Sequence, residues 1–151
     1  MPTKMTFASM DYVPEGTPGS QRVAILEKPY SLKVVHAMIP EPSDDEIRIK
    51  IKYVGICGSD LEAYRGLRKP EFISFPSRLG HEVGGVIDKI GANVKHLKVG
   101  QKVVCRYVWG AYAEYIVCKP FNVQVVPDDF DLLDVSLIEI LPGVIHAAEL
   151  S

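Results

Sequence analysis

The sequence has no excess of charge and no long hydrophobic run. Lysine and arginine number 17 and aspartate and glutamate 19, a formal net charge of −2. No basic field therefore points to nucleic acid or to an anionic membrane surface. No apolar stretch approaches the roughly 18 residues of a membrane-spanning helix, and the N-terminal stretch MPTKMTFASMDYVPEG lacks the apolar core of a signal peptide. We expect a soluble, cytoplasmic protein that binds neither nucleic acid nor membrane.

Paired cysteines and nucleotide-binding glycines are missing as well. The three cysteines are an odd number without a CxxC motif, so they form no disulfide framework and suit a reducing compartment. No GxGxxG motif follows an expected strand, so no dinucleotide-binding half is predicted. The 151 residues are enough for one compact domain.

Strands separated by turn residues dominate what is present. The stretch EIRIKIKYVG, residues 46–55, alternates isoleucines with charged residues, which predicts a half-buried antiparallel strand. Further strands are predicted at 22–27, 32–38, 82–91, 102–108, 111–118 and 121–127. The fold class is therefore mainly β, a partly open barrel with a few short helices.

Two short helical regions are predicted between and after these strands. Ser59 and Glu62 have the spacing of a capping box, which predicts a helix that Ser59 caps. Asp131 is the expected N-cap of the stretch LLDVSLIEI. Pro142 should interrupt that helix, and another should begin at about Val144.

One cysteine and one histidine stand in unusual surroundings. Cys57 lies in GICGSD, between two glycines at the end of the alternating strand, and His81 with Glu82 lies in the glycine-rich LGHEVGG. Thiolate, imidazole and carboxylate together suit zinc, and their wide separation in sequence suits a catalytic site. Glu139 is a candidate third or fourth ligand. On spacing alone, a buried structural role for Cys57 and His81 stays open.

Four stretches resemble the zinc-dependent medium-chain alcohol and polyol dehydrogenases: VGICGSDLEAYRG, LGHEVGGVIDKIGANVKHLKVGQKVV, AYAEYIV and VVPDDFDLLDVSLIEILPGVIHAAEL. The resemblance implies a GroES-like catalytic domain over residues 22–151, after a lead segment at 1–21. It implies oxidation of a small alcohol or polyol with NAD or NADP. The family's Rossmann domain, which would hold that cofactor, would begin after Ser151, and the full-length protein would be a homo-oligomer.

The same resemblance assigns metal ligands. Cys57 matches the thiolate ligand and His81 the imidazole ligand, while Glu82 matches a carboxylate that binds zinc or lies just behind it. Glu139 falls in a carboxylate position of the polyol dehydrogenases, although Ile140 replaces the proline that follows it there.

Two further roles follow from the resemblance. Asp60 matches a carboxylate that orients the zinc-bound histidine, and Ser59 matches the hydroxyl that takes the alcohol proton. The catalytic residues are thus expected to be Ser59, Cys57 and His81. Many relatives carry a histidine at the position of Glu62, so the outer part of their proton relay is not reproduced here.

Many relatives also insert a lobe with four cysteines that holds a structural zinc. Here only six residues, CRYVWG, separate Val104 from Ala111. We therefore expect one zinc per chain, with Cys105 and Cys118 buried as small apolar residues. Trp109, where the lobe is missing, is a candidate for the border of the substrate cleft.

Three other classes remain as alternatives. A zinc-free quinone-reductase type would not need Cys57, His81 and Glu82 together, and neither would a ring-forming co-chaperone. A zinc-binding GroES-like module without catalytic activity of its own is the third alternative.

Overall fold

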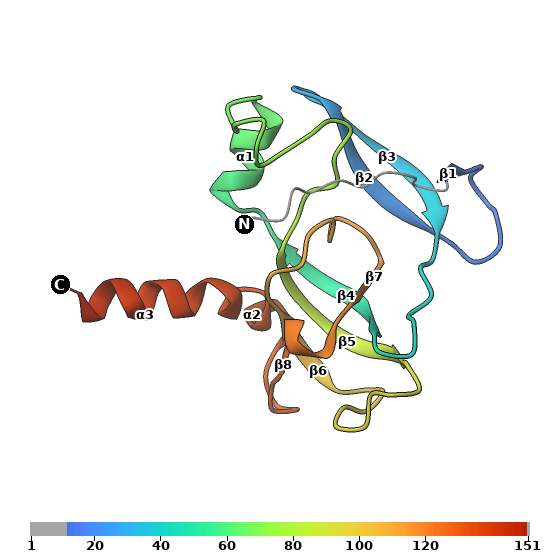
Figure 1. Ribbon diagram of the computed structural model, residues 1–151, viewed down its shortest axis with the longest axis vertical. Helices are drawn as coiled ribbons and strands as arrows, with labels where there is room; N and C mark the ends of the chain where they lie inside the picture. The colour runs from blue at the N-terminus through green and yellow to red at the C-terminus, as the bar shows by residue number, and fades with distance from the viewer. Residues whose placement is uncertain (1–11, 151) are drawn as a thin grey trace.

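The computed structural model describes residues 12–150 and arranges its strands in two antiparallel sheets (Figure 1). The smaller sheet, in the order β1-β3-β2, contains β1 (Tyr12–Val13), β2 (Ser20–Lys28) and β3 (Ser31–Met38). The larger sheet, in the order β7-β4-β5-β6-β8, contains β4 (Ile47–Gly55), β5 (Glu82–Ile90), β6 (Lys102–Cys105), β7 (Tyr115–Cys118) and β8 (Val123–Val125). Both sheets are open within the described residues. The mainly β, partly open architecture is confirmed.

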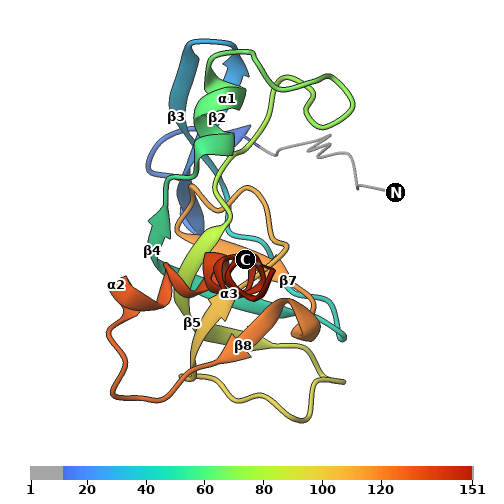
Figure 2. The same ribbon diagram turned by 90° about the vertical axis from the view of Figure 1, so that its left-hand side faces the viewer.

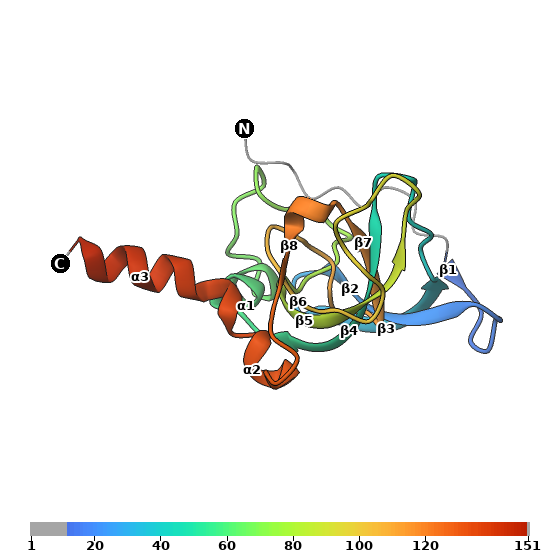
Figure 3. The ribbon, with the colours of Figure 1, turned by 90° about the horizontal axis from the view of Figure 1, so that it is seen from below.

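Short helices lie beside both sheets (Figure 2). They are α1 (Gly58–Tyr64), α2 (Leu132–Val135) and α3 (Leu141–Glu149), with 3-10 turns η1 (Pro120–Asn122) and η2 (Ile138–Ile140). Helix α1 lies by the smaller sheet, α2 packs on β5, and α3 extends away from the body without a buried residue (Figures 1 and 3). No helix between residues 12 and 150 is long and apolar enough to cross a membrane.

The main core lies on one face of the larger sheet. Ile47 and Ile49 of β4 are fully buried, as their alternation with charged residues predicted. They pack with residues of the neighbouring strands and loops, including Val83, Ile87, Val103, Cys105, Ala111, Ile116 and Cys118. This packing fixes the end of β4, from which the chain enters α1.

Contacts between the sheets place α1. Isolated bridges pair Val23 with Ala113 and Leu26 with Ser77. Leu26, which is fully buried on β2, also packs against Ala63 of α1 in a second, smaller core. Helix α1 is therefore held on the smaller sheet, although it begins only three residues after the end of β4 in the larger sheet.

The predicted cap of α1 is wrong. Cys57 is the N-cap, and its backbone N–H donates to the carboxylate of Asp60 at 3.0 Å. Ser59 lies inside the first turn, and Glu62 is exposed. The Cys57-x-x-Asp60 spacing serves the same end as the expected Ser59-x-x-Glu62 spacing, two residues earlier.

The predicted break at Pro142 is also wrong. Asp131 caps α2 as expected, since its Oδ1 accepts from the backbone N–H of Leu133 at 2.8 Å. Helix α3, however, begins at Leu141 and has Pro142 in its first turn. Proline is tolerated there because the first N–H groups of a helix have no intrahelical partner. The predicted strand at 102–108 ends at Cys105.

Candidate metal centre

Three side chains that are common metal ligands meet where α1 and β5 begin. The Cys57 sulfur, a ring nitrogen of His81 and a carboxylate oxygen of Glu82 all lie within 4.8 Å of one another. Cys57 directly precedes α1, and His81 directly precedes β5, whose first residue is Glu82. The ladder between β4 and β5 pairs Gly55 with Glu82. Antiparallel pairing therefore brings the two distant segments together.

Gly55 leaves the room that the Glu82 carboxylate occupies. A Cβ atom at position 55 would lie 2.1 Å from Glu82 Oε2, far inside contact distance. A larger residue at position 55 would therefore displace the Glu82 carboxylate. The sequence marked this glycine as a flank of Cys57, but the structure gives it a separate steric role.

Asp60 accepts hydrogen bonds from the segments that carry the three side chains. Its Oδ2 accepts from the Cys57 backbone N–H and from the Tyr112 hydroxyl, both at 3.0 Å, and its Oδ1 accepts from the Gly80 N–H at 3.1 Å. Burial, and then the negative charge of Asp60, raise the pKa of Tyr112, so the hydroxyl remains a donor. Asp60 therefore fixes the backbone on both sides of the candidate centre.

His81 keeps one ring nitrogen without a hydrogen bond. Its Nδ1 is buried and has no hydrogen-bond partner among the described residues. The nearest carboxylate oxygen, Asp60 Oδ1, is 3.8 Å away, too far for a hydrogen bond. The imidazole also packs on the Trp109 ring, with 4.4 Å between ring centres. A buried imidazole with an unsatisfied nitrogen is costly unless a further group completes the site.

The donor set suits zinc in chemistry and in size. Zinc bonds of about 2.0–2.3 Å at tetrahedral angles place ligand atoms roughly 3.3–3.8 Å apart. The ligand atoms, within 4.8 Å of one another, would therefore draw together by at most about 1.5 Å on binding. Rotation of three side chains is sufficient for such a change.

Glu139 lies near this cluster without belonging to it. It is half-buried on η2. Burial raises the pKa of its carboxyl group, the charge of Glu82 raises it further, and His81 acts in the opposite direction. These interactions place Glu139 within electrostatic reach of both residues, but the group of atoms within 4.8 Å contains only Cys57, His81 and Glu82.

Ser59 lines an open cavity of about 360 Å³. Its carbonyl oxygen accepts a long hydrogen bond, 3.5 Å, from the Arg68 guanidinium. The cavity is lined by Ser59, Glu62, Leu67, Arg68, Lys69 and Phe72.

Residues 43–128 match the family model described as the alcohol dehydrogenase GroES-like domain. The chain belongs to this family. Membership agrees with the resemblance found in the sequence, and the match covers β4 to β8, including the segments that carry the three converging side chains.

Curated relatives from this family are oxidoreductases. The chain is 32% identical over 162 residues to D-xylulose reductase of Saccharomyces cerevisiae, an alignment that covers 87% of this chain and 46% of that protein. It is 30% identical over 160 residues to sorbitol dehydrogenase of Bacillus subtilis, covering 87% of this chain and 45% of that protein. The chain thus spans slightly less than half the length of these two relatives.

A solved structure shares the fold. It is the short chain alcohol dehydrogenase rspB from Escherichia coli CFT073 in complex with NADH, with a TM-score of 0.70 and 30% identity. The similarity covers 80% of this chain and 42% of that chain.

The other two cysteines of this GroES-like domain are not part of the group of converging ligand atoms. Cys105 is fully buried and Cys118 nearly so, both in the main core. A hydrogen bond between the two thiols, together with burial, raises the pKa of Cys105. Burial agrees with the small apolar role predicted for both.

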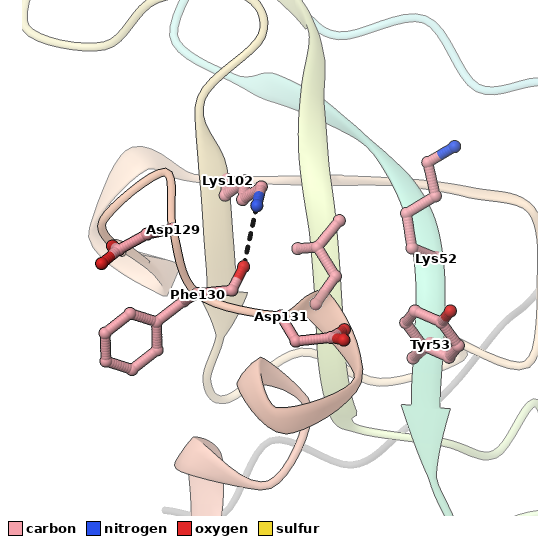
Figure 4. Close-up of a pocket in the computed structure, with 7 residues that line it drawn as sticks. Lys52, Tyr53, Lys102, Asp129, Phe130 and Asp131 are labelled. Carbon is pink, nitrogen blue, oxygen red and sulfur yellow. Dashed lines mark hydrogen bonds between the residues drawn. The ribbon is translucent and has the colours of Figure 1, made fainter.

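A larger cavity, of about 530 Å³, contains none of the predicted site residues (Figure 4). It carries charges of both signs, and the Lys102 ammonium donates to the Phe130 carbonyl at 2.7 Å. It is lined by Lys52, Tyr53, Lys102, Asp129, Phe130, Asp131 and Leu132. Of the predicted site residues, Ser59 alone lines either of these two cavities.

Sequence reasoning missed two residues that shape the site. Tyr112 lies in the strand predicted at 111–118 and was assigned no role in the site, yet its hydroxyl donates to Asp60. Arg68 received no role, yet its guanidinium carbon stands 5.7 Å from the centre of the Trp109 ring. Both contacts join residues far apart in the chain, and no local motif in the sequence indicates them.

Proposed function

We propose that this chain is the zinc-binding catalytic domain of an NAD(P)-linked alcohol or polyol dehydrogenase. The domain comprises residues 22–151, after a lead segment at 1–21. The observation that carries the proposal is the convergence of Cys57, His81 and Glu82 within 4.8 Å. It occurs in a family whose relatives include a xylulose reductase and a sorbitol dehydrogenase.

These three residues would hold one zinc ion. Glu139 would be a fourth ligand or would exchange with one of the three. A small closing movement would let the free His81 Nδ1 donate to Asp60 Oδ1, now 3.8 Å away. That pairing fixes the imidazole and leaves its other nitrogen for the metal, the usual arrangement behind a metal-bound histidine.

Bound zinc would supply a Lewis acid that favours the deprotonated alcohol, and NAD(P) would accept the hydride. The chain's own residues do the remaining work. Ser59, which lines the smaller cavity, takes the alcohol proton on its hydroxyl oxygen and passes its own proton toward solvent. Asp60 keeps Cys57 in place through its hydrogen bond to the backbone. The Trp109 ring packs against the His81 ring and helps to hold it in place.

The setting follows from the same proposal. The substrate is a small alcohol or polyol, and the surface for NAD(P) lies mainly outside these 151 residues, because no GxGxxG motif follows a strand here. The complete enzyme is a homo-oligomer of a reducing cytoplasm, where the Cys57 thiol stays available to the metal.

The experiment uses the natural gene product that carries this chain. Zinc-loaded protein should reduce NAD or NADP with a polyol such as sorbitol or xylitol, lose that activity on chelation, and regain it with zinc. Ser59→Ala should keep its zinc and lose on the order of a hundredfold in kcat.

Activity that survives complete removal of zinc would overturn the proposal. Retention of zinc with no turnover on any alcohol would instead support the zinc-binding module without catalysis.

A further inference from the structure

Arg68 is held between two aromatic rings at the edge of the candidate site. Its guanidinium carbon lies 5.7 Å from the centre of the Trp109 ring and 6.0 Å from the centre of the Phe72 ring. Cation–π attraction to both rings restrains a side chain that would otherwise be flexible. The direction of the guanidinium is therefore set before any ligand arrives.

The same indole ring contacts the metal centre. The Trp109 ring centre is 4.4 Å from that of His81. The two separations together limit the distance between the His81 ring centre and the Arg68 guanidinium carbon to about 10 Å. A sugar alcohol with one end at the metal and a charged group at its other end can therefore reach Arg68.

The positive charge of Arg68 is not neutralised within residues 12–150. None of the ion pairs of these residues involves Arg68 or Lys69. The hydrogen bond from Arg68 to the Ser59 carbonyl is long, 3.5 Å. A guanidinium has five N–H donors in a planar fork, so most of them remain available to a ligand.

The cavity that Arg68 lines is also lined by Ser59, the proposed proton acceptor. Ser59 and Arg68 line the same space of about 360 Å³, within the size range of small-molecule sites. Lys69 adds a second positive charge and Glu62 one negative charge, which leaves one positive charge in excess. An anion is thus favoured over a cation.

We propose that Arg68 binds an anionic substituent of the substrate, so that the preferred substrates are polyols that carry a carboxylate or a phosphate group. The inference rests on the proposed function and narrows its substrate class. A planar guanidinium matches both anions through two parallel N–H bonds. The Lys69 ammonium group also attracts an anion, but no aromatic ring among the described residues holds it in position.

The test measures binding to the zinc-loaded chain by titration calorimetry. The probes share one carbon skeleton: galactitol, galactonate and galactitol 1-phosphate, with inorganic phosphate as the control for an anion alone. At least one anionic probe should bind about tenfold or more tightly than galactitol. Whichever probe shows that gain identifies the source of the charge.

Two variants separate Arg68 from the general charge of the cavity. Arg68→Gln should reduce the preference for the anionic probe to about threefold or less, and Lys69→Gln, the same change of charge in the same cavity, should keep most of it. Zinc affinity and the thermal unfolding midpoint of each variant show that the fold and the centre are intact.

Equal affinity for all three skeleton probes, no binding of either anion by the zinc-loaded chain, or equal effects of the two variants would each overturn the inference alone. A chain that binds no zinc would overturn the proposed function and this inference with it. Inorganic phosphate that binds as tightly as the phosphorylated probe would also count against it, because the polyol would then contribute nothing.

Discussion

Replacing Gly55 by alanine should drive the Glu82 carboxylate out of the metal centre. The new Cβ would lie 2.1 Å from Glu82 Oε2, whereas ordinary contacts begin at 3.4 Å. The carboxylate oxygen must therefore move by about 1.3 Å or more, which exceeds the tolerance of about 0.2 Å for a metal–ligand distance. Cys57 and His81 are not displaced by the same atom, so the change should remove one ligand of three.

We expect zinc affinity to fall by about 10- to 100-fold or more. Loss of a residue that only hydrogen-bonds to a ligand already has an effect of that size. The metal-free chain should lose about 1–3 kcal/mol of stability, because an added methyl group overpacks the contact between β4 and β5. Competition with a zinc chelator measures the affinity, and urea unfolding of the metal-free chain measures the stability.

Gly58→Ala is the matched control. No atom lies within 4 Å of a Cβ built at position 58, and alanine suits the first turn of α1. This variant should bind zinc as the parent does and be as stable or slightly more so. Equal zinc affinity in the Gly55→Ala and Gly58→Ala chains would refute the reasoning, because Glu82 would then not be a ligand in the position described.

The remaining predictions concern the thiols and the supports of the centre. Cys57→Ser should abolish tight zinc binding, while Cys105→Ser and Cys118→Ser should leave zinc affinity unchanged and lower the free energy of unfolding by about 1–3 kcal/mol each, because they place a hydroxyl in the core. Chelator competition measures the affinity and urea unfolding the stability. A loss of zinc binding on replacement of either buried thiol would contradict the assignment. Tyr112→Phe removes one donor to the buried carboxylate and should lower zinc affinity about tenfold, whereas unchanged affinity would show that this support is dispensable. Asp131→Ala removes the cap of α2 and should cost about 1 kcal/mol in urea unfolding without affecting zinc.

Local patterns predicted most of the strands. Ile47 and Ile49 alternate with charged residues, and the structure buries both on one face of β4. Such a pattern depends only on the two-residue repeat of a strand, so it can be read without the rest of the fold. The N-cap of α2 at Asp131 was predictable for the same reason.

Patterns failed where a distant contact decided between local options. Ser59 is the better helix cap by residue type, but Asp60 is held in place by Gly80 and Tyr112 and selects Cys57 instead. Those partners lie 20 and 52 residues away. Spacing in the sequence could not indicate them.

The candidate site divides in the same way. The motifs around Cys57 and around His81 and Glu82 indicated which residues to examine, and the pairing of β4 with β5 brings these residues together. The space that Gly55 leaves and the contacts of Trp109 with Arg68 and with His81 are properties of packing. Neither has a signature that can be read along the chain.

The most direct test of the zinc assignment is X-ray absorption at the zinc edge, on chain loaded with zinc and freed of weakly bound metal. We predict one zinc per chain, with one sulfur at about 2.3 Å and nitrogen or oxygen ligands at about 2.0–2.2 Å. In Cys57→Ser the sulfur contribution should disappear. Two tightly bound zinc ions per chain, or a sulfur ligand that persists in Cys57→Ser, would contradict the centre described here.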